Sequence, residues 1–404
     1  MDDGQEGRKT GMKRTALLSL LIAATVLLSG CNYHNELKNL QLIYATALDL
    51  NEKNEIVTTV TIQSPGSKER TAPTHEVITA SGPTMEEALY QKVGTQLAGP
   101  IGTSKNQVML ISDKLARTDL ASLLDATFRS SSDPMLSMVA IVRGKASSLI
   151  DLERIGSATA GEYLRKLIIS ARYETSIPNV TLHKIFPIFY DPGRDSALPI
   201  LKRVGNRAEI DGIALMNNRR FTGYSLNPDQ STLLLLLEGK LGGTCVITRN
   251  ISNDGMGKNE GNSENDADSE NEGKMNVENH SQYASINVVS MNRSKKVWLE
   301  NSRKVHVRIR LQLEAALIEY GKNSMADKQT IDDLENRLSA MLTAEAKQAT
   351  GMLKQANSDP LGIGRDLMAF HRGTWNKMDW NTVYPQTEFE PIIKVKIVSK
   401  GIKN

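Results

Sequence analysis

The most regular pattern in the chain is an alternation of apolar and polar residues between positions 304 and 314. Every second residue there is apolar: Val305, Val307, Ile309, Leu311 and Leu313. A period of two predicts a strand with one buried and one solvated face, which is typical of an antiparallel sheet. A shorter alternation at residues 391–399 predicts the final strand.

A helical pattern separates these two strands. Between residues 330 and 357 the apolar residues recur every three or four positions: Ile331, Leu334, Leu338, Met341, Leu342, Ala349 and Leu353. They form one stripe along a helix about 40 Å long, at a rise of about 1.5 Å per residue. We expect this helix to lie across the C-terminal sheet.

The first half of the chain alternates shorter strand and helix patterns. Residues 40–62 predict a hairpin, and residues 107–112 and 136–142 predict buried strands. Residues 119–128 predict an apolar-striped helix, so the order is that of an α+β or α/β unit. Residues 177–200 contain four prolines and predict a packed connector.

The middle of the chain contains a helix start and an unusual acidic segment. Asn227 and Pro228 suit the N-cap and the first position of a helix. Residues 252–282 hold eight acids, two lysines and almost nothing apolar. Because such a segment cannot bury enough surface to offset the entropy of ordering, we expect a disordered insertion there.

Together these patterns predict an α+β protein with three mixed α/β domains in a row. We expect an N-terminal α/β domain at residues 40–200 and a middle domain, with the acidic insertion, at residues 201–300. A C-terminal domain with a long helix on an antiparallel sheet follows at residues 301–404. A chain of 404 residues suits two or three domains of typical size.

The N-terminus has the layout of an export signal. Residues 16–28 are an uncharged apolar run, about 20 Å long as a helix and too short to cross a hydrocarbon core of roughly 30 Å. A charged start, an apolar middle and small residues before a cut are typical of a secretory signal peptide. Translation starts at Met1 or at Met12. Four cations precede the apolar run: Arg8, Lys9, Lys13 and Arg14.

The end of the apolar run, Leu28-Ser29-Gly30-Cys31, resembles the lipobox of bacterial lipoproteins. The resemblance implies a signal peptide at residues 1–30, cleavage between Gly30 and Cys31, and a diacylglyceryl thioether on Cys31. Residues 31–39 would then be a lipidated tether. The alternatives are an ordinary signal peptide with an incidental cysteine, and an uncleaved anchor.

Familiar catalytic motifs do not occur in the sequence. It has no Gly-x-Ser-x-Gly elbow, no His-Glu-x-x-His, no Cys-x-x-Cys and no Walker loop. Residues 239–244 are glycine-rich, but their spacing favours a turn over a phosphate loop. The histidines show no ligand spacing, and the alternating acids from Asp266 to Glu272 do not fit a calcium loop. We expect no enzyme activity, no metal and no cofactor.

Single residues with chemical potential have plainer explanations. Cys245 lies in a predicted strand, where a small buried hydrophobe is expected rather than a reactive thiol. His306 alternates with apolar residues and is expected to be solvated. Trp375 and Trp380 are expected to anchor the last helix on the sheet rather than to form a platform for a sugar or a base.

Charge indicates one candidate surface. The net charge is +3, and the chain outside the acidic segment is mildly basic, which is not a nucleic-acid signature. We expect a solvated basic face on the last sheet, with docking of partners or lipid as the alternative. Four residues would form it: Arg308, Arg310, Lys394 and Lys396.

Several stretches resemble the Ger(x)C family, the C subunits of GerA-type spore germinant receptors. The most specific is Asp359-Pro360-Leu361-Gly362-Ile363-Gly364, followed by Trp375, Trp380 and Tyr384-Pro385. Tyr33 stands where the family often has tryptophan, and Tyr384 where it often has phenylalanine. Further resemblance lies in Cys31, in the hairpin ending at Asp49, in Ser81-Gly82-Pro83-Thr84, in residues 139–145, in Asp211-Gly212-Ile213-Ala214 and in residues 221–224.

The resemblance implies a non-enzymatic lipoprotein on the outer face of the inner membrane of a spore. It also implies assembly with two integral-membrane subunits, A and B, into a receptor for small nutrients. An alternative is a lipid-anchored solute-binding protein of a transporter, which would need two similar lobes and a hinge. An envelope hydrolase is a third class, which the missing motifs disfavour.

Overall fold

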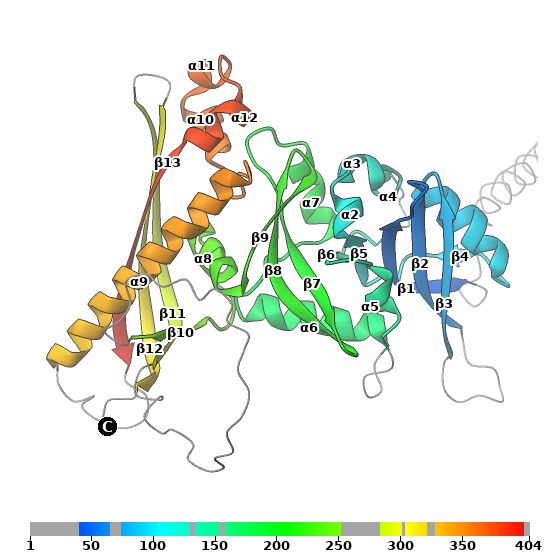
Figure 1. The fold of residues 1–404 in the computed structure, drawn as a ribbon, viewed down its shortest axis with the longest axis horizontal. Coiled ribbons are helices and arrows are strands. Elements are labelled where there is room, and N and C mark those ends of the chain that lie inside the picture. Colours follow the sequence, from blue (N-terminus) through cyan, green and yellow to red (C-terminus); the bar gives the residue numbers. More distant parts are fainter. Residues whose placement is uncertain are drawn as a thin grey trace, which may run out of the picture.

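The computed structural model describes residues 40–64, 74–129, 134–152, 159–251, 283–300, 304–320 and 328–399. These residues form two β-sheets with helices on and between them, arranged one after the other along the longest axis of the molecule (Figure 1). The α+β fold class expected from the sequence is confirmed.

The first sheet has nine strands, and it is parallel in the middle and antiparallel at both sides. The main order is β3-β2-β1-β5-β6-β7-β8-β9, with β4 paired to β1. The contacts from β1 through β5 and β6 to β7 are parallel, and the hairpins on either side are antiparallel. The strands are β1 (Gln41–Leu50), β2 (Ile56–Ser64), β3 (Thr74–Gly82), β4 (Ile101–Gly102), β5 (Val108–Ser112), β6 (Met138–Val142), β7 (Ala197–Val204), β8 (Arg207–Asn217) and β9 (Arg220–Leu226).

Helices cover both faces of the first sheet, which explains why its central strands are apolar throughout. In Figure 1 one group lies above the sheet and the other below it. The upper group is α2 (Asp113–Ala116), α3 (Leu120–Leu123), α4 (Asp125–Arg129) and α7 (Leu182–Phe189), and the lower group is α5 (Ser147–Ile150) and α6 (Ala160–Tyr173). Two short helical turns, η2 (Glu87–Val93) and η3 (Gly94–Gln96), follow β3.

The connector expected at residues 177–200 contains regular structure instead. It holds α7, with Pro187 inside the helix, and the start of β7. Leu182, Ile185 and Phe189 are buried on one side of α7. The burial of this stripe outweighs the local cost of a proline within a helix.

The domain boundary expected between residues 200 and 201 falls inside β7. Ile200 pairs with Ile141 of β6 on one side and with Gly212 of β8 on the other. The first sheet therefore continues through this position to the end of β9. The division into three domains stays a prediction.

The second sheet has four strands in the order β10-β11-β12-β13. The strict alternation predicted for residues 304–314 is confirmed, since its apolar residues are buried and its polar residues lie on the opposite face. The strands are β10 (Val246–Asn250), β11 (Tyr283–Glu300), β12 (Lys304–Tyr320) and β13 (Glu388–Ser399). The helical elements of this half are α8 (Pro228–Glu238), α9 (Lys328–Gln355), α10 (Ile363–Phe370), α11 (Arg372–Trp375), α12 (Trp380–Val383) and η5 (Tyr384–Gln386).

The expectation of a purely antiparallel second sheet is wrong, because β13 runs parallel to β12. The long helical connection from α9 to η5 returns the chain to the starting end of β12, as a parallel pair requires. The long helix expected near residues 330–357 is confirmed as α9, and its apolar stripe faces the core of this sheet.

Polar side chains of α9 cover the outer edge of β13. The side chains of Thr343, Ser339 and Glu335 accept backbone N–H groups of β13 at 3.0, 2.9 and 2.7 Å. The three donors are Ile393, Val395 and Ile397. Because an uncovered edge strand is a template for unwanted pairing, this helix also protects the sheet.

Some sequence features lie outside the described residues. These are the signal at residues 1–30, Cys31 with its tether, and the acidic segment 252–282. Within the part of the chain that the structure describes, no helix is long and apolar enough to cross a membrane.

Candidate functional site

The two sheets are joined by a polar junction, and the segment Asp359–Gly364 lies at its centre. This segment connects α9 to α10 and packs on residues 191–196, the loop between α7 and β7. Sequence patterns identified the first of these segments but not the second. A Pro192-Gly193 turn between two aspartates was the available signal.

Asp359 caps the start of α10 from a fully enclosed position. Its carboxylate accepts the backbone N–H groups of Ile363 at 3.0 Å and Gly364 at 2.8 Å, and the residue is 1% exposed. Gly362 has a φ of 66°, a left-handed conformation that glycine adopts without strain. Aspartate and glycine at these two positions therefore set the direction of the chain as it enters α10.

Asp195 links this segment to the first sheet. Its carboxylate accepts the N–H of Asp359 at 2.9 Å and the N–H of Asn218, in the β8–β9 turn, at 3.0 Å. The backbone N–H of Asp195 donates in return to the carbonyl of Asp359 at 3.0 Å. One side chain thus connects the loop before β7, the β8–β9 turn and the C-terminal half.

Two glycines allow the segments to approach this closely. A methyl group added to Gly364 would lie 2.9 Å from the Cα atom of Gly193 and 2.9 Å from Nε1 of Trp380. The N–H of Arg365 donates to the carbonyl of Gly193 at 2.9 Å. No other residue type fits at Gly364 without movement of the backbone.

Arg194 brings α8 into the junction. Its guanidinium binds the carboxylate of Glu238 at 2.8 Å and the carbonyl of Pro360 at 3.1 Å. Arg365 binds Asp191 at 2.8 Å in the same loop. The junction is therefore closed by charge-assisted hydrogen bonds that fix its geometry.

Burial shifts the ionisation of both junction aspartates. It raises the pKa of Asp359 to about 7 and that of Asp195 to about 6, although backbone N–H donors oppose the shift at both residues. The negative charge of Asp191 adds to the increase at Asp195. Both carboxyls therefore gain protons at mildly acidic pH. Because both accept backbone N–H groups of the segments that meet here, their role is to hold the junction together.

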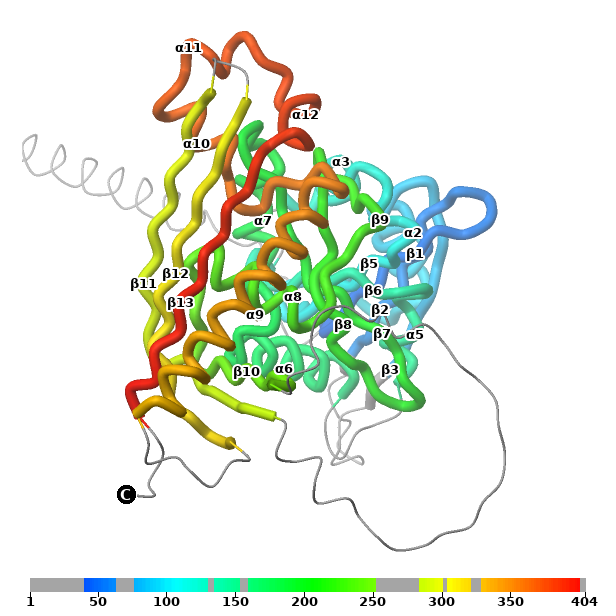
Figure 2. The backbone as a smooth tube through the Cα atoms, turned by 60° about the vertical axis from the view of Figure 1, so that its left-hand side comes forward, coloured from blue at the N-terminus to red at the C-terminus, as the bar shows by residue number. Residues whose placement is uncertain are grey.

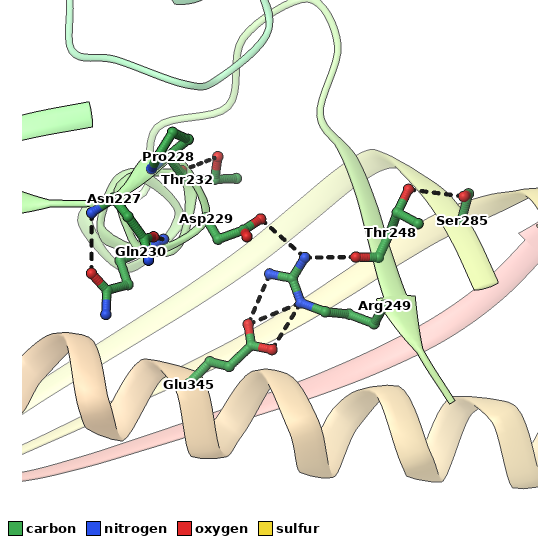
Figure 3. Close-up of polar contacts among 9 residues, drawn as sticks. All are labelled: Asn227, Pro228, Asp229, Gln230, Thr232, Thr248, Arg249, Ser285 and Glu345. Atoms are coloured by element: carbon green, nitrogen blue, oxygen red, sulfur yellow. Dashed lines mark hydrogen bonds and ion pairs between the residues drawn. The ribbon is translucent and has the colours of Figure 1, made fainter. Parts of the chain in front are cut away.

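A second ion-pair cluster, within the half that holds the second sheet, centres on Arg249 and ties β10 to α8 and α9 (Figure 3). The guanidinium binds Glu345 of α9 through Nε at 2.8 Å and Nη2 at 2.8 Å, and it binds Asp229 of α8 at 3.1 Å. The Arg249 side chain is only 12% exposed. The predicted N-cap of α8 is confirmed, because Asn227 accepts the N–H of Gln230 at 2.9 Å.

The tryptophans expected to act as core anchors do so. Rings of Trp375, Trp380, Tyr384 and Phe389 follow one another at centroid distances of 5.7, 5.3 and 6.1 Å. Tyr384 is 1% exposed, and the other three pack on the core of the second sheet.

Two further acids in the family-like stretches support turns. Asp49 accepts the N–H groups of Ala146 at 2.7 Å and Ser147 at 2.9 Å, which holds the turn after β6. Asp211 pairs with Lys202 at 3.1 Å and with Arg143. The roles of both acids are structural.

The burial predicted from the sequence is right for Cys245 and wrong for His306. Cys245 is fully buried and burial raises its thiol pKa to about 11, so the expectation of a buried hydrophobe is confirmed. The expectation of a solvated His306 is wrong. Its ring stacks on Trp298 at 5.2 Å and lies 3.0 Å from Glu300 and 3.2 Å from Glu388.

The expected basic face carries both signs of charge. Arg308 pairs with Glu390, because the parallel register places these residues side by side. Lys304 pairs with Glu388 on the same strands. Glu388 and Glu390 therefore neutralise the end of this face at which β12 and β13 begin.

A polar cleft of about 360 Å³ lies beside the junction. Asp191, Arg194, Asp195 and Arg219 are among its lining residues, and each already has a partner within the chain. Within the described ranges, no group of three or more His, Cys, Asp and Glu side chains could hold a metal ion.

Two family models and one full-length relative match almost the whole chain. The family model "Spore germination protein N-terminal domain" matches residues 33–203, and "Spore germination B3/GerAC like, C-terminal" matches residues 211–401. GerQC, a spore germination protein of Bacillus cereus, is 23% identical over 97% of this chain and 99% of its own length.

Two further proteins are similar to this chain. YfkR of Bacillus subtilis (strain 168) is 26% identical over 56% of this chain and 62% of its own length. The crystal structure of the GerBC protein has the same fold, with a TM-score of 0.55 and 17% identity, over 88% of this chain and 97% of that one. The chain therefore belongs to the Ger(x)C family of spore germination proteins.

Proposed function

We propose that this chain is the lipid-anchored C subunit of a nutrient germinant receptor. The observation that carries the proposal is the match of both family models, which together span residues 33–203 and 211–401. In this proposal Cys31 is acylated after cleavage at Gly30. The body then lies on the outer face of the spore inner membrane, beside integral-membrane A and B subunits.

We further propose that the subunit is a docking body without enzyme activity. The aspartates and arginines at the junction are engaged in hydrogen bonds and ion pairs that hold the two halves together, and the aromatic rings pack on the core of the second sheet. A solute-binding protein of a transporter is less suitable. The two sheets differ in strand number and in strand order, so they are not two similar lobes.

The test is a Cys31→Ala variant, with Cys245→Ala as the matched control. Cys31→Ala should abolish the lipid mass on the N-terminal peptide and strongly reduce the germination response to nutrients. Cys245→Ala removes the other cysteine, which is buried, and should leave both unchanged. A Cys31→Ala strain with normal membrane retention and normal germination would contradict the proposal.

A further inference from the structure

A group of apolar side chains is exposed around α7. The ring of Phe186 lies 4.6 Å from that of Phe128 and 5.2 Å from that of Tyr190. Phe186 is 39% exposed, Tyr190 55% and Leu136 80%. We name these four residues the α7 patch. Because exposed apolar surface is unfavourable in water, such clusters mark contact surfaces.

The α7 patch is not an accidental fringe of the core. Ile185 and Phe189 are buried against the first sheet, and each is followed by an exposed aromatic residue, Phe186 within α7 and Tyr190 directly after its last residue. Residues one position apart point about 100° away from each other on a helix. The apolar stripe of α7 is therefore wider than the part that the sheet covers.

The patch lies at the end of the first sheet where the chain enters the fold. β5 runs parallel to β1 and β6 runs parallel to β5, so the three strands begin at the same end of the sheet. Leu40 immediately precedes β1 and Leu136 lies shortly before β6, so both residues are at that end. Three backbone hydrogen bonds link β1 to α7 at this end: Gln107 N–H to Tyr44, Met138 N–H to Gln107, and His183 N–H to Met135, at 2.9, 2.9 and 2.8 Å. Since hydrogen-bonded segments of a sheet lie about 4.8 Å apart, α7 is about 15 Å from β1.

The other end of β1 points away from this site. The β1–β2 turn at residues 51–55 projects at the right in Figure 2, and about 33 Å of strand separates it from Leu40. Lys53 is exposed in this turn. It provides a reference position on the same sheet but at the far end.

The length of the tether limits how far the patch can be from a membrane. Cys31 lies nine residues before Leu40, and such a length spans at most about 32 Å. If Cys31 is acylated, as in the proposed function on which this inference rests, the chain enters the first sheet within that distance of the bilayer. The α7 patch is at this same end.

We propose that the α7 patch contacts the phospholipid bilayer as a second attachment point beside the lipid anchor. Phe186 and Leu136 would enter the interface, and Tyr190 combines an apolar ring with a hydroxyl that suits the headgroup region. Lys184 is exposed on the same helix and can approach lipid phosphates, and the Arg129 side chain, which pairs with Asp125 at 2.7 Å, is still 78% exposed. A lipid chain alone leaves the body free to rotate, whereas a second contact fixes the face it presents to membrane partners.

The test places a fluorescent probe in the patch. The acylated full-length protein carrying Phe186→Trp is reconstituted into phosphatidylcholine–phosphatidylglycerol vesicles with brominated acyl chains. The emission of the parent protein, from Trp298, Trp375 and Trp380, is subtracted. Bromine should quench the added emission of Phe186→Trp, and of Tyr190→Trp as a second probe. Lys53→Trp, at the opposite end of β1, is the control and should stay unquenched.

Flotation with the vesicles separates this inference from the proposed function. Protein that floats while both patch probes stay unquenched would overturn the bilayer contact alone, and protein that does not float would overturn both. Probes that are shielded only in membranes containing the A and B subunits would assign the patch to a protein partner and also overturn the bilayer contact.

Discussion

The glycine contact at the junction gives the sharpest test of how the two halves are held together. Gly364→Ala would place a methyl group 2.9 Å from the Cα and carbonyl oxygen of Gly193 and 2.9 Å from Nε1 of Trp380. Two of these neighbours are backbone atoms, so α10 must move away from the loop at residues 191–196. Overpacking of this kind costs about 1–3 kcal/mol.

The matched control is Gly351→Ala. Gly351 lies inside α9, about one turn before its last residue Gln355, and an added methyl group there meets nothing within 4 Å. Alanine in a helix interior is favoured over glycine by about 0.5–1 kcal/mol. The same chemical change should therefore destabilise the protein at one glycine and stabilise it at the other.

The assay is urea unfolding followed by tryptophan fluorescence. Trp380 lies against Gly364 and Trp375 next to Trp380, so the emission reports on the junction. With a denaturant slope of about 2 kcal/mol per M, Gly364→Ala should lower the midpoint by about 0.5–1.5 M. Gly351→Ala should raise it slightly. Equal midpoints for Gly364→Ala and the parent protein would refute the account of the junction.

Three further substitutions should change the pH dependence of stability, the free energy of unfolding and the rate of amide exchange. Burial raises the folded-state pKa of Asp359 to about 7 and of Asp195 to about 6, above the usual 3.8, so the folded chain holds more protons than the unfolded chain in this window. Stability should therefore fall as pH rises from about 4 to about 7, and Asp359→Asn should flatten this slope in urea titrations at several pH values. Arg249→Lys keeps the charge but loses the two-pronged bond to Glu345, and should cost about 1–2 kcal/mol in the same unfolding assay, a cost absent if the pair contributes nothing. Thr343→Val keeps the shape but removes the acceptor for the backbone of β13, so amide exchange at the edge of this strand should speed up by roughly fivefold, and unchanged exchange would show that the contact does not protect it.

Periodic patterns predicted the C-terminal half well because burial on one face dictates them. The apolar residues of β12 alternate and those of α9 recur every three or four positions, and each set faces the same core. The direction of β13 could not be read in this way. Alternation is the same for parallel and antiparallel strands, so the parallel pairing of Arg308 with Glu390 was missed.

Long-range contacts explain the remaining failures. Asp195 and Asp359 are separated by 164 positions, and nothing in the local pattern around either residue specifies the other. The family-like motif marked Asp359 and Gly364 but gave no indication of what they contact. His306 was misjudged for the same reason, since its glutamate partners lie on other parts of the sheet.

The proposal that this chain is a germinant receptor subunit is tested most directly by what it binds in the spore. The full-length protein, tagged at the C-terminus and expressed at its native level, would be isolated from detergent-solubilised spore membranes and its partners identified by mass spectrometry. The account predicts recovery of polytopic A and B receptor subunits at near-equal amounts. Recovery of a transporter permease, or of the chain without any membrane subunit, would contradict it.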